Sequence, residues 1–465
     1  MKKIIIIGGG IGGLTAAVYL KKKGVDVLLL EAGSELGGLA KSEEFAGHHF
    51  DAGPYILLDK PGLVWAFQQL DTSFEEQVSL HLIEQIYSVN KTIQFDKDLE
   101  VTVNRFNDLW KGQGDLYRDF VLKTGATYQK LNPYTYMSHP TPWHLLKNMD
   151  LGLMAFMAST LGKVLHKYKL NDELVNAVGI WTHVASQALH AAPSPMAFVP
   201  SLFHLTGSYY PIRGMGSIAR ALENMALNAG VEIRKNTPVQ KILVQNQVVQ
   251  GVELADGTRE DATVVLSNMS AVGTYRHLLD HVPAAYSQYL DALPLQSPGF
   301  CIYLKVKNKA GSSAPYLQFQ LNKDIPTTVA FVNPSFLGYN PSEPYHSARL
   351  IAPLPHHLAE KMSREEEMKM MFTITDQEWW RENLLDFEIT HYRTSKDWGK
   401  DFHLYRNSMN PVMTAAFMRK GRIAHQSKYF KGLYFCGSST HPGQWISFCS
   451  VSGILASQKI LQTYA

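Results

Sequence analysis

The chain opens with a run of apolar residues that shows no polar alternation. Residues 4–7 are four isoleucines, and residues 25–30 form a second, largely apolar run directly after Gly24. A strand without alternation is typical of a parallel sheet that is covered on both faces. Residues 14–23, between the two runs, have the length and composition of a helix. The order strand, helix, strand predicts a βαβ unit at the N-terminus.

Glycines join the first strand to the helix. Residues 8–13 place Gly8, Gly10 and Gly13 at G-x-G-x-x-G spacing. This spacing gives a tight turn, lets a pyrophosphate approach the backbone, and allows close packing of helix on strand. Amides at the start of the helix then face the diphosphate. Glu31, at the tip of the second strand, is placed to accept ribose hydroxyls and disfavours a 2′-phosphate. The unit predicts a dinucleotide site without separating FAD from NAD.

Further along the chain, apolar runs alternate with turns. Residues 446–461 have the pattern of a helix, and turns such as Asp256-Gly257 separate short apolar segments. We predict strands at residues 231–233, 241–244, 248–254, 264–268, 300–306, 327–332 and 433–436.

An apolar stripe at helical spacing covers residues 143–168, with lysines on its flanks. It predicts one helix. A core helix of a lid is one interpretation, and a lipid-facing or tunnel-lining helix is the other. The stripe consists of Leu146, Met149, Leu153, Met157, Leu161, Val164 and Tyr168.

Composition narrows the classes of protein. At 465 residues, the chain is too long for one ordinary core, so two domains or a large insertion are expected. The formal net charge of +3 gives no reason to expect a nucleic-acid partner. The three cysteines form no C-x-x-C pair, which points to a reducing compartment, with the cytoplasm as the default. No stretch is long and apolar enough to predict a spanning helix, although attachment to the inner face of a membrane is left open.

Three blocks resemble the bacterial-type phytoene desaturases, a family of flavin enzymes of carotenoid synthesis related to amine oxidases. The first comprises the glycine turn, Glu31, a glycine pair at residues 37–38 and the turn at residues 50–54. The second is residues 209–218, similar to the family's Y/F-P-x-G-G-x-G segment. The third is residues 433–443, similar to its L-Y-x-x-G-x-x-T-H-P-G signature.

The resemblance implies FAD as the cofactor and an α/β fold. We expect a Rossmann-like, three-layer FAD-binding domain from residues 1–85, 211–285 and 418–465. An inserted α+β substrate domain would comprise residues 86–210 and 286–417. The residue pattern and the resemblance together predict cofactor contacts at Gly8, Gly10, Ile11, Gly12, Gly13, Glu31, Ala32, Gly37, Gly38, Leu39, Gly53, Pro54, Tyr55, Val239, Gly437, Ser438, Trp445 and Ile446.

The chain also departs from the family pattern. Leu39 stands where the family commonly has arginine, and Arg213 stands where a glycine is usual. Gln444, Trp445 and Ser447 replace the family's small residues and proline. These differences lie close to the expected flavin ring and point away from phytoene or lycopene itself as substrate.

No catalytic residue follows directly from the sequence. His441 could act as an acid or base, or it could simply form hydrogen bonds beside the cofactor. Tyr55, Tyr210, Arg213 and Trp445 could line the flavin face and orient a substrate, or pack in the core. Hydride transfer to a flavin needs position and exclusion of water more than a catalytic triad.

Other sites are poorly supported. Residues 214–219 spell G-x-G-x-x-A, but no apolar strand precedes them and the following strand ends in Arg234-Lys235, so we expect no second nucleotide site. The electron acceptor is then oxygen, a quinone or another carrier. The histidines lack partners at ligand spacing, so no metal is expected.

The predicted function is dehydrogenation of an apolar, polyene or lipid-like metabolite by FAD. Three alternatives stay open. The first is an isomerase or cyclase without net redox, the second an oxidase of an amine or a carrier-tethered intermediate, and the third a binding protein that keeps FAD only as structure.

Overall fold

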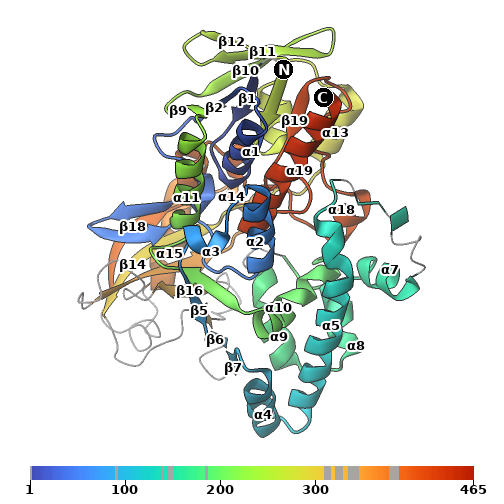
Figure 1. Ribbon diagram of the computed structural model, residues 1–465. Helices are drawn as coiled ribbons and strands as arrows, with labels where there is room; N and C mark the ends of the chain where they lie inside the picture. Colours follow the sequence, from blue (N-terminus) through green and yellow to red (C-terminus); the bar gives the residue numbers. More distant parts are fainter. Residues whose placement is uncertain are drawn as a thin grey trace.

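A parallel sheet of five strands forms the centre of the upper part of the molecule (Figure 1). The computed structural model describes residues 3–88, 93–138, 140–141, 143–144, 150–183, 187–307, 316–319, 328–333, 345–375 and 387–464. The strands lie in the order β19 (Leu433–Phe435), β13 (Val264–Ser267), β1 (Ile4–Ile7), β2 (Val27–Leu30) and β9 (Glu232–Arg234).

The four isoleucines of β1 show why this sheet is covered on both faces. Ile4 and Ile6 pack with helices α1 (Ile11–Lys22), α11 (Gly216–Asn228) and α19 (Ile446–Tyr464). Ile5 and Ile7 point the other way, toward α12 (Ala271–His277) and the sheet β10 (Val239–Gln245), β11 (Val248–Leu254) and β12 (Arg259–Asp261). All four are buried, which contributes roughly 2 kcal/mol for each side chain. The three-layer α/β fold is therefore confirmed.

The second large sheet of the molecule is antiparallel. Its order is β15 (Tyr316–Phe319), β16 (Thr328–Asn333), β17 (Tyr345–Ala352), β14 (Phe300–Lys307) and β18 (Phe387–Arg393). Arg393 joins this sheet to the hairpin of β3 (Ser42–Phe45) and β4 (His48–Asp51), because its Nη1 donates to Glu43 Oε2 at 2.6 Å. Two further antiparallel pairs are β5 (Leu80–Ile83) with β8 (Ser208–Pro211) and β6 (Gln85–Ser88) with β7 (Ile93–Asp96).

A group of helices lies at the lower right of the molecule in Figure 1. This group contains α4 (Leu99–Leu109), α5 (Gln113–Thr135), α7 (Leu151–Met157), α8 (Leu161–Lys167), α9 (Asp172–His183) and α10 (Phe198–Leu205). The remaining helices are α2 (Lys60–Gln69), α3 (Phe74–Gln77), α13 (Ala284–Asp291), α14 (His356–Ala359), α15 (Arg364–Thr375), α17 (Ser395–Asp401) and α18 (Ala415–Lys420), with single 3-10 turns at Gly38–Ala40, Ser194–Ala197 and Tyr405–Asn407.

The prediction of one helix over residues 143–168 is wrong. Within the described residues 150–168 the chain forms the short helices α7 and α8, and Thr160 separates them in an extended conformation. Thr160 caps α8 by accepting a hydrogen bond from Lys163 N, and it forms a β-bridge with Pro193. The apolar spacing continued across the break, but a threonine cap ends helical periodicity. Leu146 and Met149 lie outside the described residues.

The parallel sheet draws its strands from three separate stretches of sequence. We propose that residues 1–85, 211–285 and 418–465 form the cofactor domain, and that residues 86–210 and 286–417 form the substrate domain. Within the described residues, no helix is both long and apolar enough to cross a bilayer.

Candidate functional site

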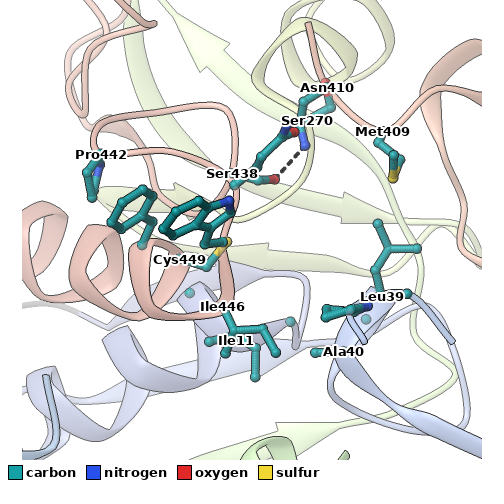
Figure 2. Close-up of a pocket in the computed structure, with 18 of the residues that line it drawn as sticks. Ile11, Leu39, Ala40, Ser270, Met409, Asn410, Ser438, Pro442, Ile446 and Cys449 are labelled. Atoms are coloured by element: carbon teal, nitrogen blue, oxygen red, sulfur yellow. Dashed lines mark hydrogen bonds between the residues drawn. The ribbon is translucent and has the colours of Figure 1, made fainter. Parts of the chain in front are cut away.

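A cavity of about 1170 Å³ lies where the parallel sheet, the antiparallel sheet and the helices meet. Small-molecule pockets commonly measure roughly 300–1,000 Å³. This cavity is therefore large enough for a dinucleotide and a second ligand together. Figure 2 shows its open centre, with Ile11, Leu39 and Ala40 on one side and Ser438 and Asn410 on another.

The glycine turn forms one wall of the cavity. Gly8, Gly10 and Gly12 line it, and α1 begins at Ile11 after an extended Gly10. Gly13 does not line the cavity, because it faces the strand: a Cβ there would stand 2.1 Å from Gly8 O. Its role is the close packing of helix on strand that the spacing predicts.

Glu31 lies at the end of β2 and lines the same end of the cavity. Its Oε2 accepts a hydrogen bond from Gly9 N at 2.7 Å, and its Oε1 accepts one from Gly33 N at 2.8 Å. An ionised carboxylate keeps further lone pairs, so each oxygen can still accept from a hydroxyl group. Glu31 therefore stabilises the glycine turn and also presents its carboxylate to the cavity.

The glycine pair and the following turn lie next to the glycine turn. Gly37 N donates to Gly9 O at 2.8 Å. The turn at residues 52–54 is held by Arg349 from β17, whose Nη1 donates to Ala52 O at 2.8 Å and whose Nη2 donates to Pro54 O at 3.3 Å. The predicted cofactor residues that line the cavity are Gly8, Gly10, Ile11, Gly12, Glu31, Ala32, Gly37, Gly38, Leu39, Gly53, Pro54, Tyr55, Val239, Ser438, Trp445 and Ile446.

Gly437 does not have the role that the sequence suggests. Its amide donates to Ser452 Oγ at 2.9 Å, so it is not directed at a pyrophosphate. The side chain of Asn268 lies beside both Gly437 and Gly12, and its Nδ2 donates to Gly8 O at 3.3 Å. Asn268 lines the cavity in place of Gly437. Position alone marked Asn268 in the sequence, as the residue that directly follows a buried strand.

The candidate catalytic residues separate into two groups. His441, Tyr55 and Trp445 line the cavity, whereas Tyr210 and Arg213 do not. The hydroxyl of Tyr210 donates to Asp51 at 2.5 Å within the core. Arg213 is exposed on a turn with a left-handed backbone (φ 72°), which places it away from the cavity.

His441 holds two parts of the site together. Its Nε2 lies 3.0 Å from Tyr134 O and 3.1 Å from Thr135 O, at the end of α5. Burial lowers the pKa of His441 to about 4, and the nearby His425 adds to this effect. The neutral ring therefore donates from Nε2 to the carbonyl groups. This geometry favours a positioning role over proton transfer through Nε2.

Asp59 is a buried acid that the sequence did not single out. It caps α2, where its Oδ1 accepts from Gly62 N at 3.2 Å and from Tyr128 Oη at 3.4 Å. The side chain is 2% exposed and lines the cavity. Burial raises the pKa of Asp59 because it disfavours the charged form. A cap at a helix start gave no signal of its own, since aspartate is common there.

The wall also fits the polar parts of FAD. Within the described residues, Ser270 Oγ, Gln296 Oε1 and Trp398 Nε1 are buried without a hydrogen-bond partner, and all three residues line the cavity. Buried polar atoms without partners are rare in folded proteins, so their presence here points to a polar ligand. The wall has a second polar feature, a hydrogen bond of 2.7 Å that Asn410 Nδ2 donates to Ser438 Oγ (Figure 2). Among the residues described, no group of His, Cys, Asp or Glu could hold a metal ion.

Comparison with known proteins agrees with this geometry. The family model for flavin containing amine oxidoreductases matches residues 11–461. A 4,4'-diaponeurosporene oxygenase of Staphylococcus aureus is 25% identical over 99% of this chain and 98% of its own length. A 1-hydroxycarotenoid 3,4-desaturase of a Flavobacterium species is 29% identical over 61% of this chain and 60% of its own.

Solved structures with the same fold include two oxidoreductases. One comes from Methanosarcina mazei and has a TM-score of 0.65 at 17% identity, covering 99% of this chain and 100% of that chain. The other is a variant of putrescine oxidase with a TM-score of 0.67 at 14% identity, covering 99% of both chains.

Proposed function

Because the chain belongs to the family of flavin-containing amine oxidoreductases and is an FAD-dependent oxidoreductase, we propose that it dehydrogenates an apolar, polyene or lipid-like molecule. The related oxygenase and desaturase carry the names of carotenoid substrates, which supports a polyene for this chain as well.

The observation that carries this proposal is the apolar chamber beyond the glycine turn. Helices α5, α7 and α10 contribute its wall. Methionine side chains adapt to irregular apolar ligands, and a chamber of this kind suits a long hydrocarbon better than a small polar molecule. The residues concerned include Leu131, Met154, Met157, Phe198, Val199 and Leu202.

The residues of the site would have separate tasks. Gly10, Gly12 and Glu31 would hold the diphosphate and ribose, and the turn at residues 52–54 would lie against the ring. Bound FAD supplies the acceptor for two electrons. The apolar wall orients the substrate and excludes water, and such positioning accounts for a large share of catalysis in hydride transfer.

The outer side of the chamber suggests how an apolar substrate enters. Met154 and Met157 of α7 line the cavity, whereas Leu151 of the same helix is 74% exposed. Trp143, a few residues earlier, is 76% exposed. Exposed apolar side chains that gather at one edge can insert into the interface of a bilayer. We propose that this edge docks on a bilayer and that the substrate enters from it.

Anaerobic mixing of the FAD-loaded protein with a polyene in vesicles tests the proposal. We expect the visible absorbance of the flavin to fall, with formation of a product that has lost two hydrogens. Product formed only after prior reduction of the flavin would indicate an isomerase or cyclase. Bleaching by putrescine but not by the polyene would indicate an amine oxidase. Either result would contradict the proposed function.

A further inference from the structure

Arg422 presents a cation on the wall of the cavity, in the segment between α18 and β19. Its Nη1 donates to Ser438 O at 3.2 Å. The guanidinium also lies against Gly443, where a Cβ would stand 3.0 Å from Nη2. The missing side chain at Gly443 leaves room for the guanidinium, so Arg422 lies against the loop of residues 438–443.

No counter-charge accompanies this cation in the described part of the chain. No carboxylate there forms an ion pair with Arg422, and its carbonyl contact uses one of five N–H groups. Burial lowers the pKa of Arg422 to about 10, which still leaves it charged at neutral pH. Arg393, which does not line the cavity, is differently placed, because it pairs with Glu43 and Asp401.

The titratable groups around Arg422 do not neutralise it. His441 is neutral because burial lowers its pKa to about 4. Cys449 is also neutral, since burial raises the pKa of its thiol to about 12. His425 follows Arg422 by three residues and contacts Phe435 O through Nδ1 at 3.1 Å. Charged groups that are partly removed from water are usually paired with an opposite charge, so the presence of this cation needs a reason.

Many of the side chains that line the same cavity as Arg422 are apolar. An arginine in such a setting matches a carboxylate well, because its planar N–H groups can bind both oxygens at once. The apolar residues of the cavity include Met413, Met418, Ile423, Pro442 and Phe448.

We propose that Arg422 binds a carboxylate at the end of an otherwise apolar ligand. This inference rests on the proposed function, because it assumes that the chamber accepts a polyene. It adds that the site selects for an acidic end group. Arg422 is thus a specificity-determining residue, and it needs no part in electron transfer.

A matched pair of probes tests the inference. Retinoic acid and methyl retinoate share one polyene and differ only in the charge of the end group. Binding to the FAD-loaded protein is followed by quenching of tryptophan fluorescence. We expect the wild-type protein to prefer the acid by about tenfold, the effect of roughly 1.4 kcal/mol. Arg422→Gln should lose this preference and leave methyl ester binding within about twofold, while Arg422→Lys should keep part of it.

The control variant is Arg276→Gln, at an exposed arginine on α12 that pairs with Asp291 outside the cavity. It should bind both probes as the wild-type protein does. Equal affinity of the wild-type protein for acid and ester would overturn the inference while leaving the proposed function intact. Failure of the wild-type protein to bind either probe would contradict both the inference and the proposed function.

The anion could in principle come from the diphosphate of FAD, so the FAD content of Arg422→Gln is measured as well. We expect it to equal that of the wild-type protein. Loss of FAD together with an unchanged preference for the acid would assign the cation to the cofactor and overturn the inference.

Discussion

The hydroxyl of Tyr210 donates a hydrogen bond of 2.5 Å to the carboxylate of Asp51. The same carboxylate accepts from Met215 N and from Ser42 Oγ, each at 2.8 Å. Asp51 thereby connects the turn at residues 50–54 with the motif at residues 209–218. This contact between the two motifs supports the cavity wall from behind. Neither Asp51 nor Tyr210 lines the cavity itself.

Replacement of Tyr210 by phenylalanine should reduce stability without affecting the cofactor. Loss of a buried hydrogen bond to a carboxylate costs about 2 kcal/mol. We expect this decrease in the free energy of unfolding, measured with urea. The affinity for FAD should stay within about threefold of wild type, which is well below the roughly tenfold change that a loss of about 1.4 kcal/mol in binding would produce. Tyr209→Phe, at a half-buried hydroxyl that contacts Thr206 O at 3.3 Å, is the control and should lose less than about 1 kcal/mol. A large loss of FAD affinity in Tyr210→Phe at unchanged stability would refute this assignment.

Glu31→Gln should weaken FAD binding. The amide keeps the shape of the side chain but removes the charge that strengthens hydrogen bonds from Gly9 N, Gly33 N and the ribose. We expect the dissociation constant of FAD to rise about tenfold or more, measured by fluorescence titration of the apoprotein. Glu44→Gln, at an exposed position on β3, serves as the control. Unchanged affinity in Glu31→Gln would show that the adenosine lies elsewhere.

His204 should make the protein less stable in acid. Its Nε2 lies 2.9 Å from the hydroxyl of Tyr117, and burial lowers its pKa from 6.5 to about 4. Between these two values the unfolded state binds the proton and the folded state does not, so stability falls as pH drops through this window. The loss from this group approaches about 3 kcal/mol.

Urea unfolding at pH values from 7 to about 4.5 measures this effect. The slope against pH should be smaller in His204→Gln than in wild type. His166→Gln, at an exposed position on α8, should keep the wild-type slope. Parallel curves for wild type and His204→Gln would contradict the assignment of the neutral ring.

The double change Trp143→Ser and Leu151→Ser should weaken binding to vesicles. Both side chains are more than 70% exposed, at 76% and 74%, so their loss should leave the folded protein nearly as stable. Each buried apolar side chain contributes roughly 1.5–3 kcal/mol, so we expect binding to fall by at least about tenfold in a sedimentation assay. Leu227→Ser, at a 54% exposed position on α11, is the control. Equal sedimentation of all three proteins would exclude this edge as the docking surface.

The sequence predicted the N-terminal βαβ unit well, because its signals are local. The isoleucines of β1, the glycine turn and Glu31 follow one another within one βαβ unit, so spacing alone placed them. The prediction of one helix over residues 143–168 failed because the break depends on a contact with a distant segment. The apolar spacing continues through Thr160, and only the β-bridge of Thr160 to Pro193 and its capping hydrogen bond show where the helix ends.

The missed residues reach the cavity from distant elements. Arg349 comes from an antiparallel strand, Asn268 from the end of β13, and Arg422 from a connecting segment. Asp59 is indistinguishable in the sequence from an ordinary helix cap. Nothing near any of them in the chain indicates what it contacts, because their roles depend on packing between segments that are far apart in sequence.

A single anaerobic turnover tests the central claim most directly. FAD-loaded protein is mixed with one equivalent of a carotenoid polyene in vesicles, and both the flavin absorbance and the mass of the polyene are measured. The account predicts that each reduced flavin is matched by one polyene that has lost two hydrogens. Oxidised flavin beside a polyene of unchanged mass would contradict it.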